Sequence, residues 1–287
     1  MDSQVAVGSV SRLWRYPVKS MIGEEIESAE VIWSGFHGNR CYALVDVESS
    51  RIVSAKNPAK WARMFQCTSR LLQGGESPPI MNNGAPPVQV TLPDGRRFDI
   101  ADGRYGGAEQ ALSELFGRQV RFTAARAEPR TFTIEQYHPG IEEDREAGRT
   151  TEYFRPPEAQ AGTFTDTAAV HLVTTATLKG MSGFYPKGDF GPMRFRPNLL
   201  VDTGAANGFA ETLWVGRTLA VGDEVRLKVF KECGRCVMTT LPQGRLVSDV
   251  GILSTIMRSN RGKIGVLASV LKGGKIKKGD RIALVQQ

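Results

Sequence analysis

Long apolar runs, targeting signals and abundant cysteine are all missing from this 287-residue sequence. No segment approaches the roughly 18 consecutive apolar residues that a membrane span needs, and residues 1–10 have neither a basic flank with an apolar stretch nor an Arg-rich amphipathic pattern. Four cysteines are too few for a disulfide framework in a chain of this length. These absences predict a cytoplasmic protein without a membrane anchor.

Several catalytic motifs are also absent. The sequence has no Gly-x-Gly-x-x-Gly after a predicted strand, no Walker loop, no His-Glu-x-x-His and no Gly-x-Ser-x-Gly. Rossmann oxidoreductases, nucleotide hydrolases and α/β-hydrolases are therefore poor candidates. The formal charge of +7 favours an anionic partner. Because the basic residues are scattered and no nucleic-acid module is recognisable, we expect a phosphorylated ligand or an acidic protein and no nucleic acid.

Apolar alternation predicts a mainly β fold with a few helices. Strands are expected at Val10–Arg15, Ile26–Trp33, Cys41–Val47, Val88–Leu92, Arg97–Ile100, Val170–Val173, Leu199–Asp202, Arg217–Val221, Val225–Phe230, Gly265–Val270 and Arg281–Val285. Pro93-Asp94-Gly95 is a hairpin signal. Helices are expected at Ala108–Phe116, stopped by Gly117, and at Val247–Arg258, capped by Ser248 or Asp249.

The composition changes between Glu135 and Gly162, where charged residues, proline and glycine replace the aliphatic ones. Such a stretch is typical of a surface linker or mobile loop. We therefore predict a β-rich first domain at 1–130, a linker at 131–162 and a β-rich second domain at 163–287. Gly222-Asp223 and Gly279-Asp280 each precede a predicted strand, which suits a closed or nearly closed antiparallel barrel.

The segment Cys233-Gly234-Arg235-Cys236 is the strongest local signal for chemistry, and Val237–Thr240 after it looks like a strand. A structural zinc site would need further ligands, and a thioredoxin-like pair would open a helix. Two buried structural thiols are the third alternative. Arg235 favours a reactive thiolate, because a nearby cation stabilises the charged sulfur and thiolates suit redox metals.

This segment resembles the cysteine motif of MOSC proteins, the family named after the C-terminal domain of molybdenum cofactor sulfurases. Other motifs agree in order along the chain: Tyr16-Pro17-Val18-Lys19-Ser20, Gly38-Asn39-Arg40, Val53-Ser54-Ala55-Lys56, Val170-His171-Leu172-Val173-Thr174, Phe195-Arg196-Pro197-Asn198-Leu199 and Gly279-Asp280. The first three resemble the β-barrel module that precedes MOSC in the amidoxime-reducing molybdenum enzymes. The family usually has Gly-Asp-Arg where this chain has Gly38-Asn39-Arg40, so a salt bridge from position 39 is not carried over.

The resemblance implies a molybdenum–molybdopterin cofactor held between the two lobes, with Cys236 as the metal ligand and Cys233 as a neighbour. The implied cofactor-binding positions are Lys19, Ser20, Arg40, Thr165, Arg196, Asn198, Gly234 and Arg235. Cations suit this role because the phosphate of the cofactor must be neutralised. Asp166 matches an acidic position near the metal and is the expected proton donor, whereas His171 is expected to be a hydrogen-bonded strand-end histidine.

By the same resemblance, the activity is the two-electron reduction of small N-hydroxylated substrates such as amidoximes, hydroxylamines and N-hydroxylated bases. The chain has no iron-sulfur cysteine run, so we expect electrons from a separate donor protein. A non-redox carrier of molybdopterin or sulfur, with Cys236 as a persulfide site, is the alternative from another class.

Overall fold

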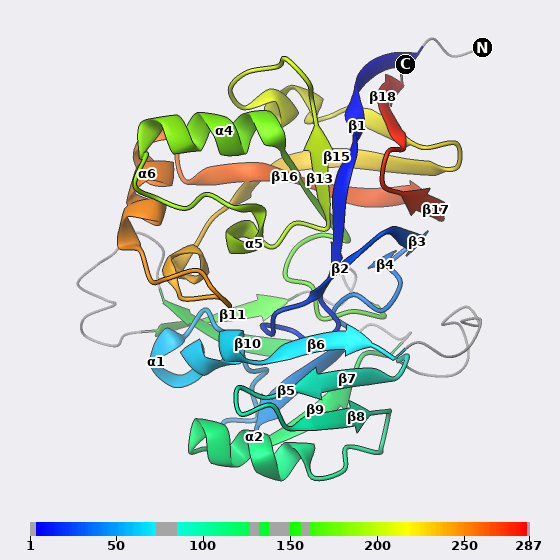
Figure 1. Cartoon of the computed structure of the whole chain (residues 1–287). Coiled ribbons are helices and arrows are strands. Elements are labelled where there is room, and N and C mark those ends of the chain that lie inside the picture. Colours follow the sequence, from blue (N-terminus) through cyan, green and yellow to red (C-terminus); the bar gives the residue numbers. More distant parts are fainter. Residues whose placement is uncertain (1–3, 73–84, 127–131, 138–149, 156–160, 286–287) are drawn as a thin grey trace.

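A computed structural model describes residues 4–72, 85–126, 132–137, 150–155 and 161–285. Two lobes are stacked along the long axis of the molecule (Figure 1). The upper lobe contains both ends of the chain, and the lower lobe contains β5 to β9 with α1 and α2. The predicted mainly β architecture with few helices is confirmed.

The upper lobe is a closed barrel of seven strands. They follow the order β13-β12-β16-β15-β14-β18-β1, and pairing of β13 with β1 closes the ring. The strands are β1 (Gln4–Arg15), β12 (Val170–Thr174), β13 (Leu199–Asp202), β14 (Thr218–Val221), β15 (Val225–Gly234), β16 (Lys263–Lys272) and β18 (Arg281–Val285). All pairings are antiparallel except β12 with β13, so the barrel is closed as expected but not wholly antiparallel.

The start of the chain belongs to this upper lobe. β1 pairs with β18 and β13, β2 (Glu24–Ile26) continues from β1, and β3 (Ser28–Ile32) lies between β4 (Gly35–Phe36) and β17 (Gly274–Lys277). The expected single strand Ile26–Trp33 is thus divided between two sheets. The division at 131–162 along the chain stays a prediction, but it is not a division in space, because strands from both ends build one barrel.

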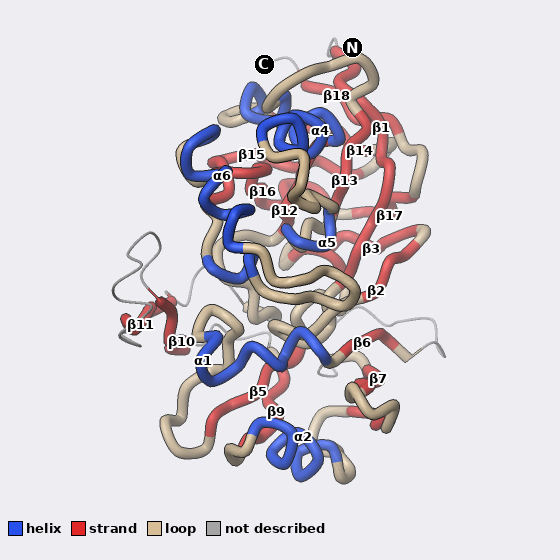
Figure 2. The backbone as a smooth tube through the Cα atoms, turned by 60° about the vertical axis from the view of Figure 1, so that its left-hand side comes forward, coloured by secondary structure: helices blue, strands red, loops and turns tan. Residues whose placement is uncertain are grey.

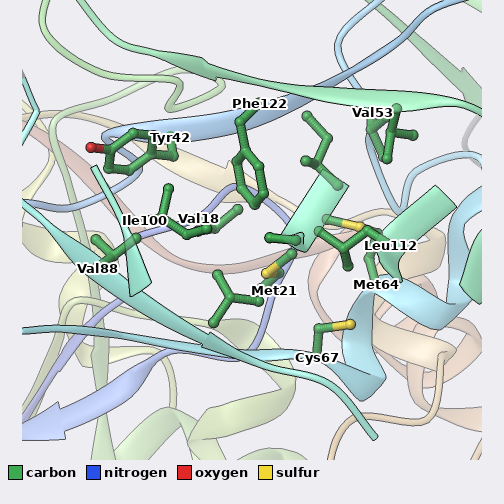
Figure 3. Packing of buried hydrophobic residues seen from close by; sticks show 14 of the residues in the cluster. Val18, Met21, Tyr42, Val53, Met64, Cys67, Val88, Ile100, Leu112 and Phe122 are labelled. Carbon is green, nitrogen blue, oxygen red and sulfur yellow. The ribbon is translucent and has the colours of Figure 1, made fainter. Parts of the chain in front are cut away.

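The lower lobe packs small sheets and helices around one core. Its elements are β5 (Tyr42–Asp46), α1 (Pro58–Trp61), the 3₁₀ turn η1 (Ala62–Gln66), β6 (Thr68–Leu71), β7 (Val88–Thr91), β8 (Arg97–Ile100), α2 (Ala108–Phe116) and β9 (Val120–Ala124). Leu112 of α2 lies near Met64 in this core, and Val88 and Phe122 belong to the same cluster (Figure 3). The helix ends where expected, since Gly117 takes the left-handed conformation, with φ 65°.

Helices cover one side of the barrel (Figure 2). They are α4 (Thr175–Phe184), α5 (Pro192–Phe195) and α6 (Val250–Asn260), accompanied by the 3₁₀ turns η3 (Ala210–Trp214) and η4 (Val237–Thr240). Asp249 caps α6, with its Oδ1 accepting a hydrogen bond of 2.8 Å from the Gly251 amide, so the second of the two proposed caps is confirmed. In the described part of the chain, no helix is long and apolar enough to cross a membrane.

Two segments differ from the sequence-based prediction. Val237–Thr240 is a 3₁₀ turn and not a strand, because the Thr239 amide and hydroxyl both donate to the Cys236 carbonyl, at 3.1 and 3.0 Å. Within the predicted linker, β10 (Phe132–Tyr137) pairs antiparallel with β11 (Thr150–Arg155). The threonines and aromatic residues of these short strands favour pairing although the stretch as a whole is polar.

Candidate functional site

A cavity of about 370 Å³ lies where the two lobes meet. The lower lobe contributes Arg40 and Lys56, and the upper lobe contributes the rest of the wall. Seven of the ten predicted site residues line it: Arg40, Thr165, Asp166, Arg196, Gly234, Arg235 and Cys236. The topology therefore brings together the motifs that the sequence keeps far apart.

Three predicted site residues have left-handed backbones, which non-glycine residues rarely adopt. Their φ angles are 65° at Ser20, 52° at Arg40 and 54° at Arg196. Hydrogen bonds hold two of them: the Arg40 amide donates to the Tyr16 carbonyl at 2.7 Å, and the Arg196 amide donates to the Pro192 carbonyl at 3.1 Å. Strain of this kind persists only where surrounding structure enforces it, and it concentrates at functional sites.

An aromatic ring supports two of the arginines. The Cζ atoms of Arg196 and Arg40 lie 4.3 and 5.5 Å from the centroid of the Tyr16 ring. The Tyr16 hydroxyl donates to the Pro197 carbonyl at 3.0 Å, and burial raises the pKa of Tyr16 to about 12, so this donor stays protonated. Tyr16 opens a motif that the sequence pointed out, but its role under the arginines was not predicted.

Arg196 is buried and charged without a full set of partners. Burial lowers the pKa of its guanidinium to about 10, which still leaves it protonated at neutral pH. Its Nη2 has no hydrogen-bond partner in the described structure, and neither has Nε of Arg235. Buried donors of this kind normally have a partner. Both arginine side chains line the cavity, and guanidinium groups there suit an anionic ligand.

Asp166 lies between two lysines. Its Oδ1 is 2.5 Å from Nζ of Lys19 and its Oδ2 is 3.2 Å from Nζ of Lys56. Lys19 is 3% exposed and donates also to the Phe164 carbonyl at 2.9 Å. Two ammonium groups at this range favour the ionised carboxylate. Lys19 thus reaches the site through Asp166, and Lys56 is a cation of the cavity wall that the sequence motif contained but did not single out.

The cysteine motif ends β15 and turns back along the cavity. Arg235 donates from Nη1 to Cys233 Sγ at 3.0 Å and from Nη2 to the Phe195 carbonyl at 2.9 Å. Cys236 precedes η4 with extended backbone, and its side chain is half-buried against the cavity. The other two thiols, Cys41 and Cys67, are buried in the lower lobe, and burial raises the pKa of each to about 12. Only the motif cysteines face the cavity among the described residues.

Two predicted residues have structural contacts instead. The Ser20 hydroxyl accepts from the Ala55 amide at 3.2 Å. Asn198 accepts from the His171 amide at 3.2 Å and donates to the Trp14 carbonyl at 3.2 Å, which joins β12 to β1. Neither side chain lines the cavity. Asn39 likewise accepts from the Tyr16 backbone amide at 3.1 Å. The asparagine side chain that stands in place of the family's usual aspartate therefore stabilises the turn.

His171 lines the cavity as a neutral side chain. Burial, aided by the charge of Arg235, lowers its pKa to about 3. Hydrogen bonds with the backbone of Arg196 and Ile264 counteract part of this shift, as expected for a hydrogen-bonded strand-end histidine, while its Nε2 has no hydrogen-bond partner within the described residues. Gly265 makes room for this ring, since a Cβ at that position would lie 2.5 Å from Nε2.

Two family models match successive parts of the chain. The model of the MOSC N-terminal beta barrel domain matches residues 7–75, and that of the MOSC domain matches residues 159–283. The chain contains both MOSC domains. This confirms the family resemblance drawn from the motifs.

Curated relatives point to the same group. The chain is 23% identical to mitochondrial amidoxime reducing component 2 of Rattus norvegicus over 257 residues, 86% of this chain and 69% of that protein. Mitochondrial amidoxime-reducing component 1 of Homo sapiens is 23% identical over 252 residues, with the same two coverages. Among solved structures, the YUAD protein of Bacillus subtilis covers 100% of both chains at 10% identity, but its TM-score of 0.46 is too low to add to the assignment.

Proposed function

We propose that this MOSC protein is a molybdenum-cofactor oxidoreductase that reduces small N-hydroxylated substrates. One observation carries the proposal: a half-buried thiol, Cys236, and a buried guanidinium with an unpartnered donor, Arg196, line the same cavity. A soft metal ligand and an anion-binding group in one cavity suit a cofactor with a metal at one end and a phosphate at the other. The similarity to amidoxime reducing components supports the choice of reaction.

Different residues of the cavity would hold the phosphate end and the metal end of such a cofactor. Arg40 and Arg196 would neutralise its phosphate, with Tyr16 fixing both guanidinium planes. Cys236 would supply the protein's thiolate to the metal, and Arg235 holds the sulfur of the neighbouring Cys233 by a hydrogen bond. Once bound, the cofactor supplies two-electron redox chemistry.

Asp166 is the proposed proton carrier. Lys19 and Lys56 hold the carboxylate at the cavity wall and favour its ionised form, so the proton that it passes on would be taken up from solvent only transiently during each transfer. Its side chain is 32% exposed, which gives solvent access to the carboxylate. A neutral His171 would not compete with it as an acid at neutral pH. A separate electron donor and a cytoplasmic location complete the proposal.

The two motif cysteines provide the sharpest test. In protein produced in a molybdopterin-competent host, we expect about one molybdenum per chain, and Cys236→Ala should abolish reduction of benzamidoxime by reduced viologen. Cys233→Ala should keep substantial activity, because Cys233 is a neighbour and not the ligand. Normal turnover by Cys236→Ala with molybdenum retained would show that the ligand is misassigned.

The same assay separates the alternatives. Equal loss in both cysteine variants would favour a zinc pair or a thiol-disulfide couple, since either needs both sulfurs. Labile cofactor without turnover in the unaltered protein would favour the carrier.

A further inference from the structure

Arg194 is a buried cation that faces no carboxylate within salt-bridge distance in the described structure. Its side chain is 1% exposed, although it forms part of the cavity wall. The guanidinium donates to three backbone carbonyls: Nε to Asp189 at 2.8 Å, Nη1 to Thr239 at 3.0 Å and Nη2 to Val247 at 3.2 Å. One side chain therefore joins the connection between α4 and α5 to two points of the connection between β15 and α6.

The loop that contains Thr239 is the Cys236 turn. The Cys236 carbonyl accepts from the Thr239 amide and hydroxyl, so the bond from Arg194 to Thr239 restrains the turn that presents the Cys236 thiol. Gln243 adds a second connection, because its Nε2 donates to the Met238 carbonyl at 3.0 Å and to the Arg194 carbonyl at 3.4 Å.

The other side of Arg194 is the anion-binding end of the cavity. Arg194 and Arg196 are separated only by Phe195, whose carbonyl accepts from Nη2 of Arg235. The strained backbone of Arg196 is set by the turn of α5 to which Arg194 belongs. Residues 194–196 thus connect the thiol turn directly to the guanidinium with the unpartnered donor.

We propose that Arg194 is a positioning residue that fixes the spacing between the Cys236 thiol and the Arg196 guanidinium. The inference rests on the proposed function, since a cofactor held at both ends needs these two groups at one fixed separation. The planar fork of an arginine can serve three carbonyls at once in set directions, which a lysine ammonium on a flexible chain cannot reproduce.

The test compares Arg194→Met and Arg194→Lys in the full chain, produced in a host that makes no molybdopterin. Iodoacetamide labelling followed by mass spectrometry gives the modification rate of each cysteine. We expect the rate at Cys236, relative to Cys233, to rise about threefold to tenfold in both variants, because a turn that loses a hydrogen bond opens more often. Cys41 and Cys67 are buried in the lower lobe and should stay protected, which shows that this lobe is intact, and near-UV circular dichroism checks the upper lobe.

A matched control is Arg118→Met. Arg118 lies in the lower lobe, where it forms ion pairs with Glu48 and Asp46. Its loss should therefore weaken the fold without changing the ratio of the labelling rates of Cys236 and Cys233. In a molybdopterin-competent host, both Arg194 variants should also carry several-fold less molybdenum than Arg118→Met.

An unchanged rate ratio in a folded Arg194→Met protein would overturn the inference. If Cys41 and Cys67 become reactive in Arg194→Met, the ratio in Arg194→Lys decides instead. The labelling rates are measured on protein without cofactor, so they test the role of Arg194 independently of the proposed function. The proposed function is tested separately, by the metal content and turnover of Cys236→Ala.

Discussion

The guanidinium of Arg196 lies over the ring of Tyr16, with 4.3 Å between Cζ and the ring centroid. The hydroxyl of the same tyrosine donates a hydrogen bond to the carbonyl of Pro197, the residue after Arg196. One tyrosine therefore contacts both the side chain of the proposed anion-binding arginine and the backbone of the residue that follows it.

This arrangement separates two substitutions of Tyr16. Tyr16→Leu removes the ring beneath Arg196, worth about 1–2 kcal/mol at a desolvated site, so cofactor retention should fall about tenfold. Tyr16→Phe keeps the ring and loses one hydrogen bond, which should cost about 1 kcal/mol of stability and leave retention nearly unchanged. Pterin content after dialysis, with urea unfolding in parallel, measures both. Equal retention in the two variants would contradict the role of the ring.

Asp166→Asn should change the charge balance of the cavity. Asp166 is the one acidic residue among its described wall residues, so we expect inorganic phosphate to bind about threefold to tenfold more tightly to the cofactor-free variant. The free energy of unfolding should fall by about 2 kcal/mol, because the buried Lys19 loses its carboxylate. Isothermal titration and urea unfolding test the two effects. Adding Lys19→Met should recover stability; if it does not, the ion pair is not the cause.

His171 predicts a pH dependence of stability. Its folded pKa of about 3 lies below the ordinary value of an unfolded histidine, about 6.5, so the unfolded chain binds the extra proton first as pH falls. The contribution of neutral His171 to the free energy of unfolding is complete above about pH 6.5 and is lost toward pH 3. It falls by about 2 kcal/mol between pH 6.5 and 5. Unfolding free energies of the wild type should therefore drop more steeply over this range than those of His171→Gln. Parallel curves would show that His171 titrates normally.

Glu211 predicts the opposite slope. Burial raises its pKa, while its Oε2 accepts from the hydroxyls of Thr174 and Thr177, each at 2.5 Å. A raised folded pKa gives stability that is complete below the unfolded pKa and is lost as pH rises through the folded pKa. The melting temperature of Glu211→Gln should therefore rise relative to the wild type between pH 5 and pH 8. A gap that does not change with pH would refute the assignment.

Local sequence patterns predicted where the helices and strands lie better than they predicted which strands pair with one another. Val225 and Leu227 alternate with the less buried Arg226 and Lys228 on β15, and the predicted strand is present because one of its faces is buried in the barrel. The pairing of β1 with β18 had no local signal, since it depends on the closure of the whole ring. Val237–Thr240 shows the limit of strand propensity, because a threonine hydroxyl bonded to Cys236 favours a turn.

Residues of the candidate site could be predicted from the sequence where the site requires a positive charge or a sulfur atom. Arg40, Arg196 and Cys236 belong to motifs, and the structure places all three on one cavity. Arg194 and Tyr16 were missed as site residues because their contacts are with backbone carbonyls and with another side chain's face. Such contacts depend on the fold and leave no spacing pattern in the sequence.

Closure of the barrel by β1 and β18 has a consequence for the order of folding. On the ribosome, β1 is made early, but its partner β18 emerges only after nearly all of the described chain. Until then, one hydrogen-bonding edge of β1 stays unpaired, and unpaired edges invite association with other chains. The lower lobe, whose strands pair over shorter stretches, can form first, and we expect barrel closure to be the slow step of refolding.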